Sequence, residues 1–466
     1  MKPNCILWVF DSLRGDHISH TGYPRATTPT IDSLASEGVC FTNAFSQAFW
    51  TGPSAGSILT SLYPLNHRNG FLYKSNDSVE SVAQSFTNLG YNTGCITTAA
   101  AINEDYYPEF DDYVCLYGNG SLSEAELAQR ITSNAIDWIE NNSEDPFFLI
   151  VWTDGTHHPY RVPNNHQRHF VEQDDFDPTV ENLKNHHSKQ QVINSYDENI
   201  RYNDSEFGKV IDYLKSNDIY DDTTIVVTSD HGELFEEHSR LEHINKYAES
   251  VVSRVLPDSL LLKTSISEES NWVGHQSVIP FDELLHIPLI FKFSRESDIE
   301  NLGQNIPHLA QSIDIAPTLL DAHPDMKPES RFQGKSLRKS IENKEEVNQY
   351  VYSSTPLLMS PGIFHSIRDK HYKYIRLELK DITDMRKEFN SDKIKFLQNM
   401  FHYINSPKEI LFDVDNGEVH NNIKHMNEKK LEFRRLFDQW EYKSEEYSFS
   451  MDSTTEEHLK DLGYLE

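Results

Sequence analysis

The chain has 466 residues, of which 37% are hydrophobic and 25% charged, and its 73 Asp and Glu outnumber 42 Lys and Arg, giving a formal net charge of -31. This is a globular composition, neither disordered nor fibrous, and the length fits one large α/β domain followed by a smaller one. So acidic a chain repels polyanions, which argues against nucleic-acid binding and against a role at anionic membranes. The carboxylate excess is typical of a halophilic protein in a high-salt cytosol, where salt screens the repulsion, or of ordinary acidic solubility.

The cysteine pattern and the start of the chain predict the compartment. The 4 cysteines, at positions 5, 40, 95 and 115, show no CxxC spacing, which indicates buried reduced thiols rather than a disulfide framework. The chain opens directly into an apolar run without a basic leader, and no apolar run approaches the ~20 residues that cross a bilayer. We therefore expect a cytoplasmic protein without a membrane segment.

Strands and helices alternate through most of the chain. A continuous apolar run predicts a strand at residues 4–10, and further strands are predicted at residues 91–97, 146–153, 223–228 and 287–293. Capping residues and amphipathic patterns predict helices at 30–37, 54–61, 79–89, 123–141 and 199–216. This alternation predicts an α/β fold with a mostly parallel sheet sandwiched by helices.

Two polar stretches, at 161–198 and 239–271, interrupt the alternation and are predicted to be insertions over the edge of the sheet or the rim of the site. Short strand patterns return at 349–353, 365–368, 373–375 and 409–413, before a charged helix at 427–446. We therefore predict a large α/β domain over residues 1–345 and a small α+β subdomain over residues 346–466.

Acidic residues and histidines follow three of the predicted strands: Asp11 the first, Asp154, His157 and His158 the third, and Asp230 and His231 the fourth. Ligands of parallel sheets bind at the carboxyl ends of the strands, so we expect these side chains to converge. Carboxylate oxygens with imidazole nitrogens suit a divalent metal ion. A single aspartate after a strand is more often a helix cap, but three such ends together favour a metal site.

Thr51 stands just before the predicted helix at 54–61, which begins near Pro53. The helix amides and the helix dipole therefore point towards its hydroxyl. A hydroxyl in this position can act as a nucleophile towards an anionic phosphorus or sulfur centre. The alternative is that Thr51 only caps the helix, and the local sequence leaves both interpretations open.

These motifs, in this order, resemble the sulfatase family of the alkaline phosphatase superfamily. The resemblance runs through residues 3–16, 28–44, 89–93, 230–233, 274–275, 282–290, 313–321, 332–337, 373–375 and 409–413. It implies an alkaline phosphatase/sulfatase-like fold and a hydrolase that acts on sulfate or phosphate esters. By position, it also implies that Asp11, Asp230, His231 and Thr51 bind one divalent metal ion (Ca, Mn, Zn or Mg), with Thr51 at the nucleophile position.

The resemblance implies further roles around this group. His157 and His275 match elements near the substrate and the metal, and either would protonate the leaving oxygen. Arg14 matches a strand-end arginine and is assigned to substrate binding, with a structural ion pair as the alternative. Asp154 and His158 are spaced as in two-zinc phosphodiesterases and, with His275, could hold a second metal ion, although one ion is favoured.

The chain departs from the family pattern at the nucleophile. Sulfatases carry a Cys or Ser there, which is oxidised to formylglycine. Threonine is a secondary alcohol, so the same oxidation cannot produce the aldehyde, and no formylglycine is expected. The arginine of this motif is replaced by Ala55, and residues 94–98 lack the lysine and histidine that grip the sulfate group in relatives.

These departures favour phosphoester chemistry. A formylglycine hydrate releases sulfate by re-forming its aldehyde, whereas a sulfated Thr51 would have to be cleared by water attacking sulfur. A phosphorylated Thr51 can be cleared by in-line attack at phosphorus, as in the threonine-bearing phosphoethanolamine transferases and nucleotide phosphodiesterases that the motif also resembles. We predict a hydrolase of small anionic esters of a sugar, lipid head group or nucleotide that favours phosphoesters. The alternatives are a phosphotransferase to a sugar or lipid alcohol and a degenerate member that only binds an anion or glycan.

Overall fold

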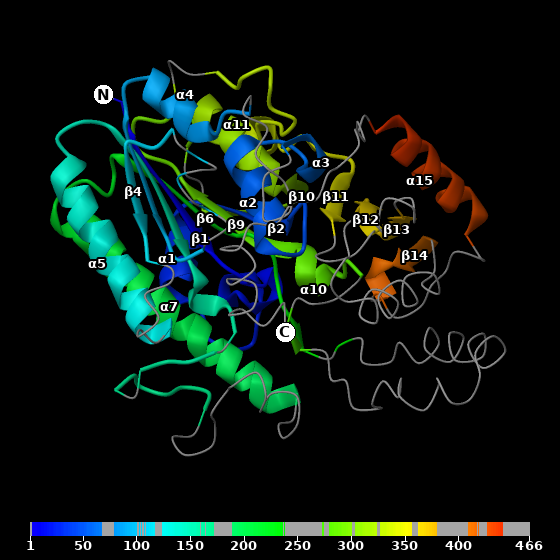
Figure 1. The fold of residues 1–466 in the computed structure, drawn as a ribbon, viewed down its shortest axis with the longest axis horizontal. Helices are drawn as coiled ribbons and strands as arrows, with labels where there is room; N and C mark the ends of the chain where they lie inside the picture. Colours follow the sequence, from blue (N-terminus) through cyan, green and yellow to red (C-terminus); the bar gives the residue numbers. More distant parts are fainter. Residues whose placement is uncertain are drawn as a thin grey trace, which may run out of the picture.

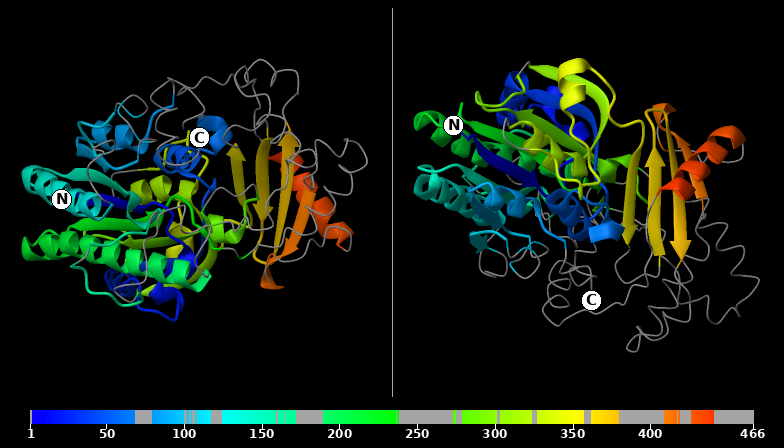
Figure 2. Two further views of the ribbon diagram at one scale, coloured as in Figure 1. Left: turned by 60° about the horizontal axis from the view of Figure 1, so that its bottom comes forward. Right: turned by 90° about the horizontal axis from the view of Figure 1, so that it is seen from above.

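In the computed structural model, a large sheet covered by helices lies beside a small antiparallel sheet (Figure 1, Figure 2). The structure describes residues 2–67, 79–99, 102, 104, 107, 109–116, 124–158, 160–163, 165–171, 189–235, 237, 273–274, 279–300, 303–323, 327–356, 362–379, 409–416, 418 and 426–440.

The large sheet has eight strands in the order β10-β2-β9-β6-β1-β5-β3-β4. They are β1 (Asn4–Phe10), β2 (Val39–Phe45), β3 (Asn92–Thr97), β4 (Asp112–Cys115), β5 (Phe147–Thr153), β6 (Thr223–Ser229), β9 (His286–Lys292) and β10 (Gln304–Gln311). All neighbouring pairs are parallel except those that β9 forms with β2 and β6. The predicted mostly parallel sheet is confirmed.

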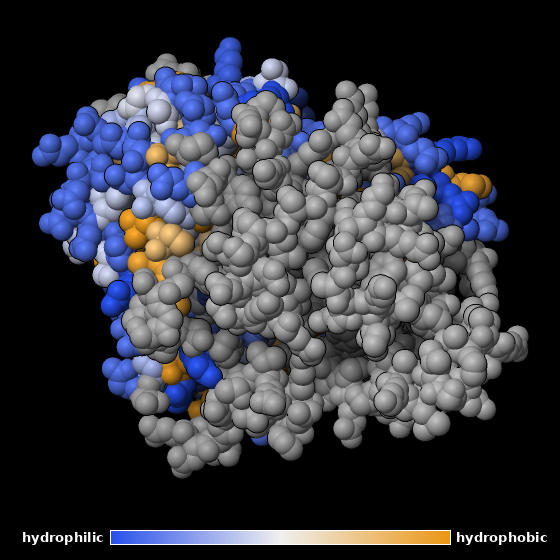
Figure 3. Space-filling model, in the orientation of Figure 1, coloured by the Kyte–Doolittle hydropathy of each residue, from blue (hydrophilic) through white to orange (hydrophobic). Residues whose placement is uncertain are grey.

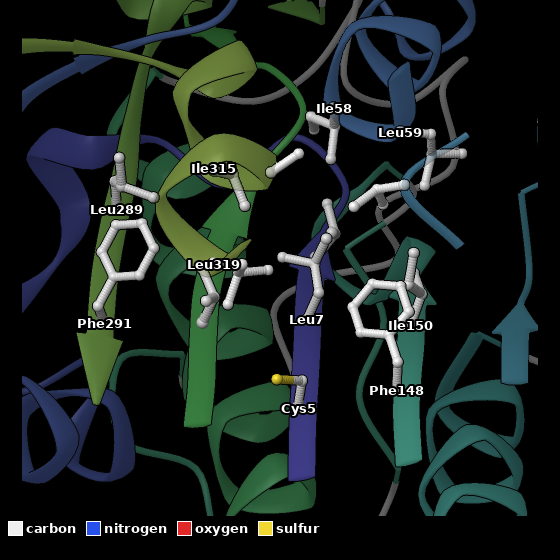
Figure 4. Packing of buried hydrophobic residues seen from close by; sticks show 14 of the residues in the cluster. Cys5, Leu7, Ile58, Leu59, Phe148, Ile150, Leu289, Phe291, Ile315 and Leu319 are labelled. Carbon is white, nitrogen blue, oxygen red and sulfur yellow. The ribbon is translucent and has the colours of Figure 1, made fainter. Parts of the chain in front are cut away.

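Helices cover both faces of this sheet. One face carries α1 (Pro29–Glu37), α5 (Glu124–Asn142) and α7 (Lys189–Ser216), and the other carries α2 (Thr51–Thr60), α4 (Val82–Asn88) and α11 (Ile315–Asp321). Side chains of β1 alternate between the two cores, so Leu7 packs on the α2 face and Trp8 on the α7 face. Figure 4 shows Leu7 and Phe148 on the α2 face, near Ile58 of α2 and Leu319 of α11.

Shorter elements connect these layers: α3 (Pro64–His67), α10 (Asp282–Leu285), α12 (Arg338–Asn343), β7 (Leu234–Phe235), β8 (Val273–Gly274), η1 (Gly15–His17), η2 (Ser19–Thr21), η3 (Asp154–Thr156), η4 (Ser312–Asp314) and η5 (Val414–Asn416). Of these, α10 lies between the large sheet and the small one (Figure 1). Residues of α10 accept hydrogen bonds from the amides of Ser46, after β2, and of Gly232, after β6.

The small sheet is antiparallel, in the order β11 (Val351–Pro356), β12 (Gly362–Arg368), β13 (Tyr372–Leu379) and β14 (Glu409–Asp413). Helix α15 (Asn427–Gln439) packs Phe433 and Phe437 against Ile367, Tyr374 and Leu411 of this sheet, and Figure 2 shows it on the outer side. These elements match the predicted strands and the first part of the predicted helix at 427–446. Residues 441–446 lie outside the described part, and the division after residue 345 stays a prediction.

Two expectations about individual elements are wrong. Helix α7 begins at Lys189 rather than at residue 199, so the end of the predicted insertion at 161–198 is helical. Its polar residues there, such as Asp197 and Glu198, are buried and satisfied by distant partners, so the local pattern did not indicate a helix. Strands β2, β4 and β10 were not predicted because polar residues interrupt their apolar runs. The predicted insertion at 239–271 lies outside the described residues.

The surface is mostly hydrophilic where it is coloured in Figure 3, and the expectation of buried thiols holds for three of the four cysteines. No helix in the described ranges is long and apolar enough to cross a membrane. Cys5, Cys40 and Cys95 are buried free thiols, and Cys115 is an exposed one.

Candidate active site

Three aspartates stand side by side at the carboxyl ends of the central strands. Phe10, the last residue of β1, pairs with Thr153 at the end of β5 and with Ser229 at the end of β6. The residues that follow are Asp11, Asp154 and Asp230. The parallel register therefore brings together three positions that are far apart in the sequence, as expected from the strand-end pattern.

Asp11, Asp230 and His231 form a buried group whose ligand atoms all lie within 4.8 Å of one another. The Nε2 atom of His231 is 3.6 Å from Asp11 Oδ1 and 3.5 Å from Asp230 Oδ2. The other oxygen of Asp230, Oδ1, accepts hydrogen bonds from the amides of Ser12 (3.0 Å) and His231 (2.8 Å), which fix the carboxylate. Its Oδ2 is buried and has no hydrogen-bond partner among the described residues.

The protonation of this group suits a cation. His231 Nδ1 lies 2.8 Å from the carbonyl oxygen of Gly232, so Nδ1 carries the proton and Nε2 presents its lone pair. Burial lowers the pKa of His231, which keeps the ring neutral. Burial and the nearby Asp11 carboxylate raise the pKa of Asp230 well above its usual range. Two carboxylates and one neutral imidazole therefore fit a divalent cation, which would satisfy Asp230 Oδ2.

Thr51 joins this group from the start of α2. Its hydroxyl donates a hydrogen bond to Asp11 Oδ2 at 3.1 Å and lies 3.3 Å from His231 Nε2. The N-cap residue of α2 is Trp50, and Thr51 is the first residue of the helix. The hydroxyl is thus directed at the ligand group, so the alternative interpretation of Thr51 as a helix cap does not hold.

His157 stands next to this group, after β5. It is buried, and its Nδ1 lies 2.6 Å from the carbonyl oxygen of His158. Burial opposes its protonation, but the carboxylates of Asp11, Glu233 and Asp154 together raise its pKa. The raised pKa favours the protonated form of His157, which is the form that a residue protonating a leaving group needs.

The second proposed metal site is not assembled within the described ranges. Asp154 and His158 belong to no group of three ligand-type residues there, because the group of Asp11, Asp230 and His231 is the one such cluster in that part of the chain. His275, which was also assigned to the reaction, lies outside the described residues. The second site and the role of His275 stay predictions.

Arg14 is engaged in ion pairs. Its Nε and Nη2 atoms donate to the two carboxylate oxygens of Asp16 (2.9 and 2.8 Å), and its Nη1 donates to the carbonyl oxygen of Glu233 (3.0 Å) and to Glu237 (2.6 Å). The side chain is buried. These contacts give Arg14 a structural position that links the segment after β1 to the segment after β6, and its assignment to substrate binding stays a prediction.

Glu233 was part of a recognised motif but had no predicted role. It is fully buried beside the histidines, and its Oε2 accepts a hydrogen bond from the Tyr160 hydroxyl at 3.0 Å. Burial raises the pKa of Glu233, although the neighbouring histidines oppose the shift. Its place directly after His231 and Gly232 was a signal available in the sequence.

Sequence reasoning also missed a set of buried polar residues on α7 that hold the loops around the site. Asp197 accepts hydrogen bonds from Tyr23 and Arg25 (both 2.7 Å). Asn203 donates to the carbonyl oxygen of Gly155 at 2.6 Å. Glu198 anchors residues 165–171, which we call the rim segment because they belong to the insertion predicted at the rim of the site, through the amides of His169 (2.8 Å), Phe170 (2.7 Å) and Val171 (3.3 Å) and the ring of His166 (3.0 Å).

The positions that depart from the family pattern are occupied as follows. Ala55 is buried in the core on α2. The segment 94–98 forms the end of β3, and the hydroxyl of Thr98 accepts a hydrogen bond from the amide of Asp154 at 2.8 Å. Ala55 and Thr98 thus pack in the core or support the neighbouring strand end, and the loss of sulfate-binding residues at these positions stays a prediction.

Comparison with known proteins agrees with this geometry. The sulfatase family profile matches residues 3–325. An ulvan-active sulfatase of Formosa agariphila is 22% identical over 94% of this chain and 74% of its own. A protein solved in complex with its substrate D-glucosamine-2-N,6-O-disulfate has a TM-score of 0.64 at 18% identity, covering 94% of this chain and 97% of its own. The phosphonate monoester hydrolase of Agrobacterium radiobacter has a TM-score of 0.64 at 17% identity, covering 94% of each chain.

A helix-covered, mostly parallel sheet with two aspartates and a histidine at its strand ends, and a threonine at the start of α2, defines a hydrolase of the alkaline phosphatase superfamily. Within that class, this chain belongs to the sulfatase family.

Proposed function

We propose that this protein hydrolyses small anionic esters with Thr51 as the nucleophile and a divalent cation held by Asp11, Asp230 and His231. The observation that carries this proposal is the direction of the Thr51 hydroxyl, which donates to Asp11 at 3.1 Å instead of capping its helix. A residue with only a structural role at the start of α2 would have no need of this contact.

Each residue has a chemical task in this proposal. Asp11 accepts the hydrogen bond of Thr51 and so orients the lone pairs of the attacking oxygen. The amides of Thr51 and Gly52, which begin α2, would stabilise negative charge on the transferring group, since Pro53 has no N–H and the amide of Ser54 donates to the carbonyl oxygen of Trp50. His157, whose pKa is raised by the surrounding carboxylates, gives its proton to the leaving oxygen. A bound divalent cation would lower the pKa of the Thr51 hydroxyl and neutralise the negative charge that develops on the transferring group.

The favoured ester class is phosphate, with a sugar as the organic part. A threonine that has accepted a phosphoryl group can be cleared by in-line attack of water, whereas a sulfated threonine has no aldehyde route for release. The preference for phosphate rests on Thr51 alone, since a phosphonate monoester hydrolase and a protein with a disulfated sugar as its substrate share this fold equally. The likeness to an ulvan-active sulfatase supports a saccharide substrate and keeps sulfate esters as the competing class.

The test is a panel of p-nitrophenyl phosphate, bis-p-nitrophenyl phosphate and p-nitrophenyl sulfate at high salt. The protein is stripped with EDTA and reloaded with Mn²⁺, Zn²⁺, Ca²⁺ or Mg²⁺. We expect cation-dependent turnover of a phosphoester, which Thr51→Val lowers by roughly a thousandfold or more. Thr60→Val, at the other end of α2, is the matched control because its hydroxyl bonds only to the carbonyl oxygen of Gly56.

The outcomes separate the alternatives. Full activity in Thr51→Val would eliminate the nucleophile assignment. Turnover of the sulfate ester alone would reverse the predicted ester preference. Transfer of phosphate to added glycerol with little free phosphate would indicate a phosphotransferase, and anion binding without turnover under any cation would indicate a degenerate member.

A further inference from the structure

Helix α10 contacts both of the segments that build the site. The carbonyl oxygen of Leu284 accepts a hydrogen bond from the amide of Gly232 at 2.8 Å, and that of Leu285 accepts one from the amide of Ser46 at 2.8 Å. Gly232 directly follows the ligand His231. Ser46 directly follows β2 and begins the segment 46–50 that leads to Thr51.

The contact with the ligand loop is close enough to exclude a side chain. A Cβ atom on Gly232 would lie 2.0 Å from the carbonyl oxygen of Glu283, well inside van der Waals contact. The backbone of α10 and the backbone of the loop after β6 therefore touch directly, without an intervening side chain that could absorb a shift. A displacement of α10 is transmitted to His231 and to the segment before Thr51.

A cluster of charged residues from the small sheet holds the first residue of α10. Asp282 Oδ1 lies 2.9 Å from Lys373 Nζ, and Asp282 Oδ2 lies 2.6 Å from Arg368 Nη1. The amide of Asp282 donates to Glu418 Oε2 at 2.7 Å, and the other oxygen of Glu418 lies 3.0 Å from Lys373 Nζ. We call these four residues the junction cluster.

The junction cluster is buried and internally balanced. The Lys373 side chain has no exposed surface, and those of Arg368 and Glu418 are nearly buried. Two cations face two carboxylates, so each charge has a directional partner in a medium where an unpaired charge is costly. Arg368 also lies over the ring of Phe45 at 3.9 Å, and Phe45 is the residue before Ser46.

We propose that Arg368 and Lys373 are positioning residues for the reaction. They act through Asp282, which fixes α10, and α10 sets the positions of the ligand loop at 230–232 and of the segment 46–50. Their effect on turnover rests on the proposed hydrolysis, whereas their effect on cation binding rests only on the cation site of Asp11, Asp230 and His231. The small sheet then helps to set the geometry of the site, although no side chain of the junction cluster is a ligand.

The test measures cation binding separately from turnover. Lys373→Met removes one of the two cations of the junction cluster. Arg368→Lys keeps the positive charge but removes the planar guanidinium group over the Phe45 ring. Arg434→Gln is the matched control, because it breaks a charged pair between α15 and Glu409 of β14, and the hydrogen bonds of Arg434 in the described part of the chain do not include α10. Mn²⁺ affinity of each full-length protein is measured by isothermal titration calorimetry, and kcat and KM on the ester that the wild type turns over.

We expect the two junction variants to bind Mn²⁺ roughly tenfold more weakly and to lose kcat with KM little changed, whereas Arg434→Gln does neither. Unchanged Mn²⁺ affinity in Arg368→Lys, with or without a loss of thermal stability, would overturn the proposal. If Lys373→Met does not fold, Arg368→Lys decides alone. An inactive wild type would defeat the proposed function and leave the calorimetric comparison intact.

Discussion

The hydroxyl of Tyr196 on α7 donates a hydrogen bond of 2.6 Å to the carbonyl oxygen of Ser12 and accepts one of 2.9 Å from the amide of Arg14. Ser12 has a φ of 63°, which for a residue other than glycine costs about 1–3 kcal/mol and needs support from its surroundings. Since Ser12 directly follows Asp11, Tyr196 supports the backbone turn that aims this carboxylate into the site.

Replacing Tyr196 by phenylalanine leaves two buried backbone groups without their partner. We expect Tyr196→Phe to lower the free energy of unfolding by about 1–3 kcal/mol and to weaken Mn²⁺ binding, because the turn at Ser12 loses its support. Urea unfolding and titration calorimetry measure the two effects. Tyr213→Phe, on the same helix, is the control and should be neutral. Wild-type values for Tyr196→Phe in both measurements would refute the assignment.

Cation binding should release protons. Burial and the Asp11 carboxylate raise the pKa of Asp230 well above its usual range, so the cation-free site keeps a proton to higher pH than a free aspartate does, and a cation must displace that proton. We expect release of about one proton per cation and an apparent affinity that falls as the pH falls. Calorimetry in buffers of different ionisation enthalpy measures this release. Identical heats in all buffers would contradict it.

The same shift gives a pH dependence of stability. An aspartate whose pKa is raised in the folded state stabilises the fold below its unfolded pKa of about 3.9, and that stabilisation is lost as the pH rises through the folded value. Stripped protein should therefore lose stability above about pH 4, and loaded protein should lose less. Asp230→Asn removes the titrating group, so the dependence on pH should become shallower in stripped protein.

Thr51→Ser tests whether the reaction needs a hydroxyl or specifically a threonine. Serine keeps the nucleophilic oxygen and its hydrogen bond to Asp11, so we expect turnover within about tenfold of the wild type. The missing methyl group frees rotation about χ1, which accounts for a moderate loss. Comparison of kcat with that of Thr51→Val decides the matter, since equal inactivity of both variants would point to a role other than nucleophile.

Glu198 offers a test of the rim segment, residues 165–171. Removing its carboxylate in Glu198→Ala takes away the acceptor of three backbone amides and of His166, so this segment loses its anchor to α7. We expect KM for a saccharide ester to rise severalfold while p-nitrophenyl turnover stays unchanged, because a small substrate does not reach the rim. Glu206→Ala, which removes a carboxylate that pairs with Lys209 elsewhere on α7, is the control. A loss of p-nitrophenyl turnover would instead place Glu198 among the supports of the reacting groups.

The part of the site that could be predicted from sequence is the part that follows buried strands. Strand β1 is largely apolar and β6 has an apolar centre, so the polar residues directly after them had to lie at the carboxyl ends of the sheet, and Asp11, Asp230 and His231 meet there. The role of Thr51 could not be predicted from its position alone, because a threonine before a helix is commonly a cap. Its contact with Asp11 depends on how α2 packs against the sheet, which the local sequence does not specify.

The supporting residues could not be predicted because their partners are remote. Tyr196 contacts Ser12 across 184 positions of the sequence, and Lys373 contacts Asp282 across 91. Within their own segments such residues look like ordinary surface residues, and their burial is acceptable only because distant groups satisfy them. This is also why the first turns of α7, rich in polar residues, were interpreted as part of an insertion.

Strand β11 reaches the segment before Thr51 by a second route. The amide of Ser354 donates to the carbonyl oxygen of Gln47 at 2.8 Å, and the hydroxyl of Thr355 accepts from the amide of Phe49 at 3.2 Å. An expression fragment that stops after residue 345 would contain Thr51 and every ligand of the candidate cation, yet it would leave these backbone groups and Asp282 without their partners. This shortened protein is therefore unsuitable for crystallisation or inhibitor screening, and the protein used should include the small sheet.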